Sequence, residues 1–196
     1  MTQSTIANIA GITLLLSEAC ALGAAAPALP TTRPGDEGKL KFIHLDVENK
    51  RIRMDCEAVN PEERLEFLVC VTGTKDYESL LRSRAKPSHL HLALLMLGLE
   101  SGEPTHFSNS ENRWIPPRGP ALNVSCEWEM DGKTVAMPAY SMLRSVKTKK
   151  PMPPAQWVFV GSRLQDGDYA ADVMGYLITL VNFEYTVIKY PMTSAA

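Results

Sequence analysis

Apolar and polar residues alternate along residues 43–56, as they do in strands that bury one face of a sheet. Asn49 and Lys50 interrupt this alternation at its middle, where a two-residue turn joins two strands. Such a turn pairs Val47 with Ile52 on the apolar face, and the same register pairs acidic with basic side chains on the other face. The hydrophobic and charge patterns therefore predict one hairpin with one register.

A second alternating segment covers residues 122–130 and ends at the dipeptide Asp131-Gly132, which is favoured in tight hairpin turns. This turn pairs Trp128 with Val135 on the apolar face, and the acidic neighbours of Trp128 then face solvent. The pattern predicts a hairpin that places a tryptophan on the core side of a sheet.

The remaining apolar segments predict further strands and one helix. Residues 65–71 form a dense run that is typical of an inner strand covered on both faces, and a long irregular loop is expected over 101–120. A stretch rich in Leu, Ala and Met predicts a largely buried helix from His89 to Leu99. Shorter runs predict further strands at 157–160, 169–174 and 176–183. The expected fold class is α+β, with a mainly antiparallel sheet of about eight strands and one buried helix.

The N-terminal segment differs in composition from the rest of the chain. Residues 6–16 are apolar apart from Asn8 and Thr13, and small residues follow as far as Ala28, as in a signal peptide and its cleavage zone. We therefore expect a signal peptide over 1–28, a linker over 29–38 and one domain over 39–193. This organisation favours export to the periplasm or cell envelope, with a cytoplasmic protein as the alternative. No integral membrane segment is expected after leader removal, because no later apolar run is long enough.

Charge and cysteine usage narrow the class of partners. The formal net charge is −2 with both signs interleaved, so no nucleic acid is expected as a partner. After loss of Cys20 with the leader, Cys56, Cys70 and Cys126 remain without any zinc-like or iron–sulfur spacing. Cys56 and Cys126 fall on apolar faces, where they either act as small hydrophobic residues or join as a disulfide if their strands face each other.

Two groups of motifs resemble the YdjY-domain family. The first runs from Phe67-Leu68-Val69-Cys70 through Lys86-Pro87-Ser88-His89-Leu90-His91 to Gly98-Leu99, and the second from Val158-Phe159-Val160-Gly161-Ser162 through Ala171-Asp172 to Leu180-Val181-Asn182-Phe183. The resemblance implies an exported bacterial protein without an established activity. Tyr77 stands where the family often has a histidine, and no cysteine series supports the ferredoxin-type label that some relatives carry.

Polar residues near the predicted helix form the best candidate site, which we expect to be ligand-binding: Glu78, Lys86, Ser88, His89 and His91. Ser88 and the free amides of the first helical turn can form an electropositive mouth for an anion or a carbonyl oxygen. A turn around 82–85 is expected to bring Glu78 within reach of His91. The structural alternative is that Ser88 caps the helix and Glu78 pairs with Arg82.

Three function hypotheses follow from these residues. The leading one is a non-enzymatic, exported binding or accessory module whose partner is a small ligand or an envelope protein. The alternative is a hydrolase or metal-dependent enzyme using Glu78, His89 and His91, whose donors suit zinc in type but not in spacing. A purely structural envelope protein is the third. No cofactor is predicted, although a divalent metal ion stays open, and Ser162 with Asp172 lacks the GxSxG signature of a nucleophile.

Overall fold

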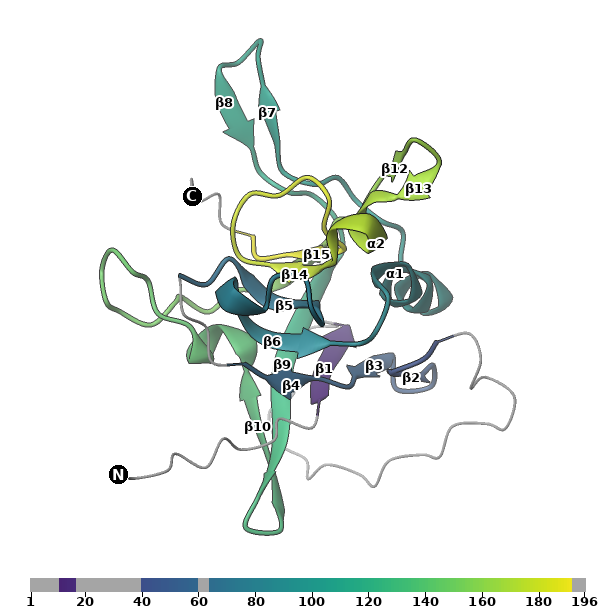
Figure 1. Cartoon of the computed structure of the whole chain (residues 1–196), viewed down its shortest axis with the longest axis vertical. Helices are drawn as coiled ribbons and strands as arrows, with labels where there is room; N and C mark the ends of the chain where they lie inside the picture. Colours follow the sequence, from purple (N-terminus) through teal and green to yellow (C-terminus); the bar gives the residue numbers. More distant parts are fainter. Residues whose placement is uncertain (1–10, 17–39, 60–63, 192–196) are drawn as a thin grey trace.

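The computed structural model describes residues 11–16, 40–59 and 64–191, and within them eleven strands form one curled mixed sheet (Figure 1). The strand order is β2-β3-β1-β9-β11-β15-β14-β5-β6-β4, and β10 pairs with β9 beside this path. The strands are β1 (Gly11–Leu16), β2 (Ile43–Asp46), β3 (Arg51–Met54), β4 (Glu57–Ala58), β5 (Phe67–Val71), β6 (Ser79–Ser83), β9 (Ala121–Met130), β10 (Lys133–Pro138), β11 (Trp157–Phe159), β14 (Tyr176–Thr179) and β15 (Ile188–Lys189).

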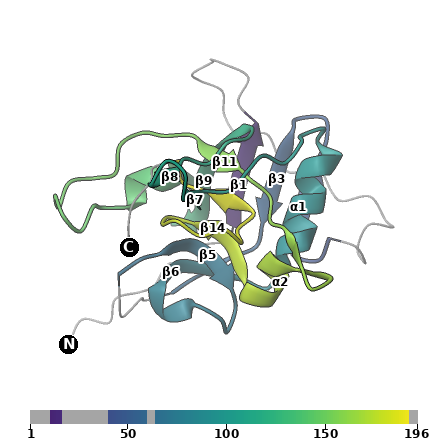
Figure 2. The same cartoon turned by 90° about the horizontal axis from the view of Figure 1, so that it is seen from above.

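Two helices and two short hairpins surround this sheet. Helices α1 (Pro87–Met96) and α2 (Ala170–Met174) lie side by side on one flank (Figures 1 and 2). The separate hairpins are β7 (His106–Ser108) with β8 (Arg113–Ile115) and β12 (Leu164–Gln165) with β13 (Asp168–Tyr169), and single 3-10 turns occupy Asp76–Glu78 (η1) and Ala139–Met142 (η2). No helix in the described part of the chain is long and apolar enough to cross a membrane.

The α+β class is confirmed, but the mainly antiparallel sheet is wrong because the sheet is mixed. Strand β5 runs parallel to β6, and β14 runs parallel to β15. The sequence pattern predicted neither β6 nor β15, and the connections over 72–78 and 180–187 are shorter than the dozen or more residues that parallel neighbours usually need. The first connection is held against the end of β6, where the Thr72 N–H donates to the Ser83 carbonyl (2.9 Å).

The first hairpin forms between the predicted segments, but the predicted register is wrong by two residues. Ile43 pairs with Met54, and Ile52 pairs with Leu45 instead of Val47. The turn is longer than two residues because Asp46 accepts hydrogen bonds from the Asn49 backbone N–H (3.0 Å) and side chain (2.7 Å). A shift of two leaves every side chain on its predicted face, so Ile43, Ile52 and Met54 are buried as the pattern requires.

The second hairpin has the predicted register. Trp128 pairs with Val135 and Cys126 with Met137, around a turn in which Asp131 and Gly132 both have positive φ. Its far end projects from the sheet (Figure 1), so Trp128 is only partly buried against the core.

Helix α1 is buried on one side only. Leu90, Ala93 and Leu94 enter the main core, while Leu92 and Leu95 are exposed, which corrects the prediction of a largely buried helix. The sheet covers one flank of the helix and does not surround it (Figure 2).

Two further element predictions are wrong. Residues 170–174 form helix α2 where a strand was expected, and the irregular loop over 101–120 contains the β7–β8 hairpin. Helix α2 ends at Gly175, whose φ of 76° is the left-handed conformation that favours glycine at helix ends.

Cys56, Cys70 and Cys126 are buried and are not joined to one another, so the disulfide alternative for Cys56 and Cys126 is not realised. Burial raises the pKa of the Cys126 thiol to about 12, as expected for a thiol that acts as a small hydrophobic group. Of the predicted signal peptide and linker, residues 1–10 and 17–38 lie outside the described residues, and 11–16 form strand β1.

Candidate functional site

The start of helix α1 is held by a carboxylate from helix α2. The backbone N–H and the hydroxyl of Ser88 both donate to Asp172, at 2.7 Å and 2.6 Å. A carboxylate at this position satisfies free helix amides and interacts favourably with the helix dipole. The electropositive mouth predicted from the sequence is therefore occupied by a side chain of the same protein.

Next to it, His91 and Tyr169 form a short hydrogen bond, with 2.6 Å between Nδ1 and the hydroxyl oxygen. The Ser162 backbone N–H donates to the same hydroxyl (3.2 Å), so Tyr169 can donate its own proton to Nδ1 of a neutral His91. Burial supports this assignment, because desolvation lowers the pKa of His91 and raises the pKa of Tyr169 to about 12.

Gly161 leaves room for the side chains of His91 and Ser101, because it has no side chain of its own. Its φ is 64°, and an added Cβ would lie 3.0 Å from His91 Cε1 and 2.6 Å from the Ser101 Cβ. The next residue, Ser162, receives the Ala171 N–H on its hydroxyl oxygen (3.1 Å). We call the set Ser88, His91, Ser162, Tyr169 and Asp172 the α1–α2 junction.

The other predicted site residues do not join this junction. Lys86 is exposed, and the Nδ1 of His89 is buried without a hydrogen-bond partner in the described part of the chain. Glu78 is buried at the end of η1 and pairs with Lys75 at 3.3 Å. The extended strand β6 separates Glu78 from helix α1, so the predicted turn around 82–85 does not fold Glu78 back onto His91. No group of three or more potential metal ligands occurs among the described residues, and the predicted metal set does not assemble.

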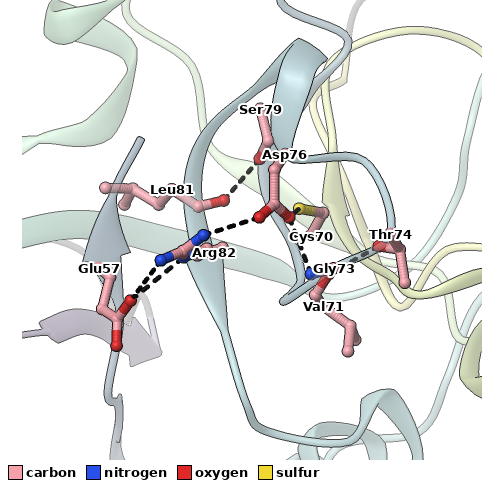
Figure 3. Close-up of polar contacts among 9 residues, drawn as sticks. All are labelled: Glu57, Cys70, Val71, Gly73, Thr74, Asp76, Ser79, Leu81 and Arg82. Carbon is pink, nitrogen blue, oxygen red and sulfur yellow. Dashed lines mark hydrogen bonds and ion pairs between the residues drawn. The ribbon is translucent and has the colours of Figure 1, made fainter. Parts of the chain in front are cut away.

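Arg82 pairs with two carboxylates that the sequence did not single out (Figure 3). Its Nη1 lies 2.9 Å from Asp76, and its Nε and Nη2 lie 3.1 Å and 3.0 Å from one oxygen of Glu57. The expected pair with Glu78 required a helix over 76–81, whereas 79–83 form a strand. Desolvation alone would raise the pKa of Asp76, but hydrogen bonds from Arg82 and the Gly73 N–H outweigh it and lower that pKa.

A cavity of about 150 Å³ opens beside this network. Most charged side chains of its wall have a partner of opposite charge, because Glu57 binds Arg82 and Asp55 lies 3.1 Å from His44. Arg84 has no ion pair among the described residues, and its guanidinium lies 4.4 Å from the centre of the Phe42 ring. The cavity is lined by Phe42, Asp55, Cys56, Glu57, Thr72, Arg82, Ser83 and Arg84.

Phe42 holds a strained backbone conformation at the edge of this cavity. Its φ is 67°, which is uncommon for a bulky residue, and its carbonyl accepts the Asp55 N–H at 3.0 Å. The conformation places the ring under Arg84. Local strain therefore coincides with the one cavity wall whose positive charge has no carboxylate partner in the described structure.

A family model described as the YdjY domain matches residues 43–193. The chain belongs to the YdjY-domain family. No curated protein and no solved structure matches it in the corresponding comparisons.

Within the YdjY domain, the two groups of motifs noted in the sequence meet in space. Ser88 and His91 come from the first group, and Ser162 and Asp172 come from the second. The α1–α2 junction is therefore built from residues of both groups of motifs. Sequence reasoning missed Tyr169, which lies between the motif segments, and Phe42, which directly precedes the matched span.

The YdjY domain also buries a lysine on β15. Lys189 is fully buried, its Nζ donates to the Leu180 carbonyl (3.0 Å), and desolvation lowers its pKa to about 7. Buried lysines with such a pKa are uncommon and change charge near neutral pH. No sequence signal marked this residue, because Lys189 follows an apolar segment near the C-terminal end of the domain.

Proposed function

We propose that this YdjY domain is a non-enzymatic, exported binding or accessory module that binds a small carboxylate-bearing molecule in the cavity beside Arg84. The observation that carries the proposal is the guanidinium of Arg84, which lines a cavity of about 150 Å³ without a carboxylate partner among the described residues. A cavity of about that size holds a molecule as large as benzene.

Charge and shape define the class of ligand. A guanidinium binds a carboxylate through two parallel hydrogen bonds, and an aromatic ring beneath it limits its orientations. Arg82 is already bound by Asp76 and Glu57, so Arg84 supplies the additional positive charge. We therefore expect a monocarboxylate of a few heavy atoms to bind more tightly than its neutral amide.

The enzymatic alternative, a hydrolase or metal-dependent enzyme using Glu78, His89 and His91, has weaker support. A nucleophilic mechanism needs a nucleophile, a base and an orienting group in one chain of hydrogen bonds. Here Glu78 pairs with Lys75, His91 binds Tyr169, and the Ser162 hydroxyl receives the Ala171 N–H. Export rests on the leader-like composition of residues 6–28.

The binding proposal is tested by calorimetric titration of the full chain with propionate and with propionamide as the neutral isostere. We expect propionate to bind and propionamide not to bind. Arg84→Gln should weaken propionate binding at least about tenfold, as the loss of a charged hydrogen-bonded pair requires. Arg144→Gln, at an exposed position outside the cavity, should leave it unchanged. Equal affinity for the two probes, or no heat with propionate at millimolar concentration, would contradict the proposal.

The metal-dependent alternative is tested separately with zinc. Melting temperatures of the full chain are compared with and without zinc, for the unchanged protein and for His91→Ala. The binding-module proposal predicts no zinc-dependent shift. A shift that disappears in His91→Ala would favour the alternative instead.

A further inference from the structure

Strand β1 lies in the interior of the main sheet and is paired on both edges. Ile12 pairs with Met54 of β3 and with Cys126 of β9, and Leu14 pairs with Ile52 and Val124 of the same strands. Strands β3 and β9 do not pair with each other. Segment 11–16 therefore connects the β2–β3 hairpin to the rest of the sheet.

This connecting strand lies outside the family domain. The family match begins at residue 43, so β3 and β9 are inside it and β1 is not. Two strands that flank a third are about 10 Å apart. The domain's own strands thus leave a slot one strand wide, which is filled by a segment from outside the domain (Figure 1).

The register fits the slot to a particular pattern of residues. Positions 12 and 14 fall in rows whose flanking residues are buried and apolar: Met54 and Cys126 in one row, Ile52 and Val124 in the other. Position 15 falls in a row with Arg51 and Asn123. The flanking strands therefore favour apolar residues at positions 12 and 14 of the inserted strand, but not at position 15.

We propose that the slot between β3 and β9 is a strand-acceptor site for an extended segment with apolar residues at two alternate positions. Segment 11–16 fills it within the chain. Because this segment has the composition of a signal peptide, its removal would expose two strand edges. Unpaired edges bind other strands, so in the mature protein the site takes an equivalent strand from a partner protein. The slot itself rests on the strand registers and is independent of the Arg84 cavity.

The test begins with the folded full chain carrying a protease site inserted between Ala28 and Leu29. After cleavage, size-exclusion chromatography and mass spectrometry show whether the N-terminal fragment stays bound. A fluorescent peptide of residues 9–18 is then added in excess, together with two variant peptides. I12D/L14D carries charges in the two apolar rows, and L15D, its matched control, carries one in the row of Arg51.

We expect the fragment to remain bound after cleavage and to be displaced by the unchanged peptide and by L15D. I12D/L14D should bind at least about tenfold more weakly, because each buried unpaired charge costs several kcal/mol. Loss of the fragment without binding of the labelled peptide would overturn the proposal, as would equal binding of all three peptides. A bound fragment that never exchanges would also overturn it, since the strand would then be a fixed part of the fold. Propionate titration of the same samples reports the Arg84 cavity separately.

Discussion

The α1–α2 junction and the Arg84 cavity both contain polar and charged residues. They differ in whether the key side chains already have hydrogen-bond or ion-pair partners within the domain. At the junction, Ser88, His91 and Asp172 each bind another side chain or backbone group of the same domain. In the cavity, Arg84 contacts the Phe42 ring and has no carboxylate partner in the described structure. The junction contains more residues of the types that catalysis uses. The cavity is nevertheless the better candidate for ligand binding, because Arg84 has no carboxylate partner in the described structure.

The difference arises because hydrogen-bond satisfaction depends on partners that are distant in sequence. Ser88 is satisfied by Asp172, and His91 by Tyr169, and both partners follow about 80 residues later in the sequence. A buried polar group whose partners are present stabilises the fold, whereas an accessible group that lacks them favours a ligand. The comparison yields four predictions on stability, from the largest expected effect to the smallest.

The largest effect is expected at Lys189, the most deeply buried charge. Its pKa is about 7 in the fold, against about 10.4 when unfolded, so the unfolded chain binds more protons between these values. Stability should therefore rise with pH from about 7 to about 10.4, by roughly 3–5 kcal/mol relative to Lys189→Met. Urea unfolding at pH 6, 8 and 10 measures this rise. Lys147→Met, at an exposed position, should keep the dependence of the unchanged protein.

The next largest effect is expected for Asp172→Ala, which removes the acceptor of two Ser88 donors at the start of α1. Leaving these partly buried donors unpaired should lower the free energy of unfolding by about 2–3 kcal/mol. Asp168→Ala, at an exposed carboxylate on β13, should change it by less than about 0.5 kcal/mol. Equal urea midpoints for the two variants would show that the junction is not a closed structural element.

Local patterns predicted the elements that local physics determines. The β9–β10 register followed from alternation and the Asp131-Gly132 turn, and the buried strand at 67–71 followed from its dense apolar composition. The first hairpin was displaced by two residues because Asp46 binds Asn49 and lengthens the turn. Side-chain to backbone bonds of this kind compete with the ideal turn and are not visible in a hydrophobic pattern.

The candidate site was only partly predictable. Ser88 and His91 were selected as candidate ligand-binding residues, whereas the partners that they bind, Asp172 and Tyr169, are 84 and 78 residues away in the sequence. Helix α2 was taken for a strand, which hid the position of Asp172. Arg84 looked like one of many surface charges, because its lack of a carboxylate partner depends on where Asp55, Glu57 and Asp76 bind.

A smaller effect is expected for His91, whose pKa burial lowers below its ordinary value. The unfolded chain then binds more protons below about pH 6.5, so the stability from neutral His91 is present above that pH and lost as pH falls. His91→Gln should flatten this dependence and cost about 1 kcal/mol at pH 7.5 through the lost Tyr169 bond. Chemical unfolding between pH 5 and 7.5 measures both effects, and a slope that persists in His91→Gln would assign it to another group.

The smallest effect on stability is expected where we propose the ligand to bind. Arg84 is exposed and has no hydrogen bond among the described residues, so Arg84→Gln leaves no buried partner unsatisfied. The free energy of unfolding should change by less than about 0.5 kcal/mol, while propionate binding weakens at least about tenfold. Thermal and urea unfolding measure the first quantity, and calorimetry measures the second.

If Arg84→Gln destabilised the fold as much as Asp172→Ala, Arg84 would be a structural residue like those of the junction, and the contrast between the two regions would be wrong. Stability that stays unchanged while binding is lost is the combination that a structural role cannot produce, because a residue that only supports the fold alters both quantities together.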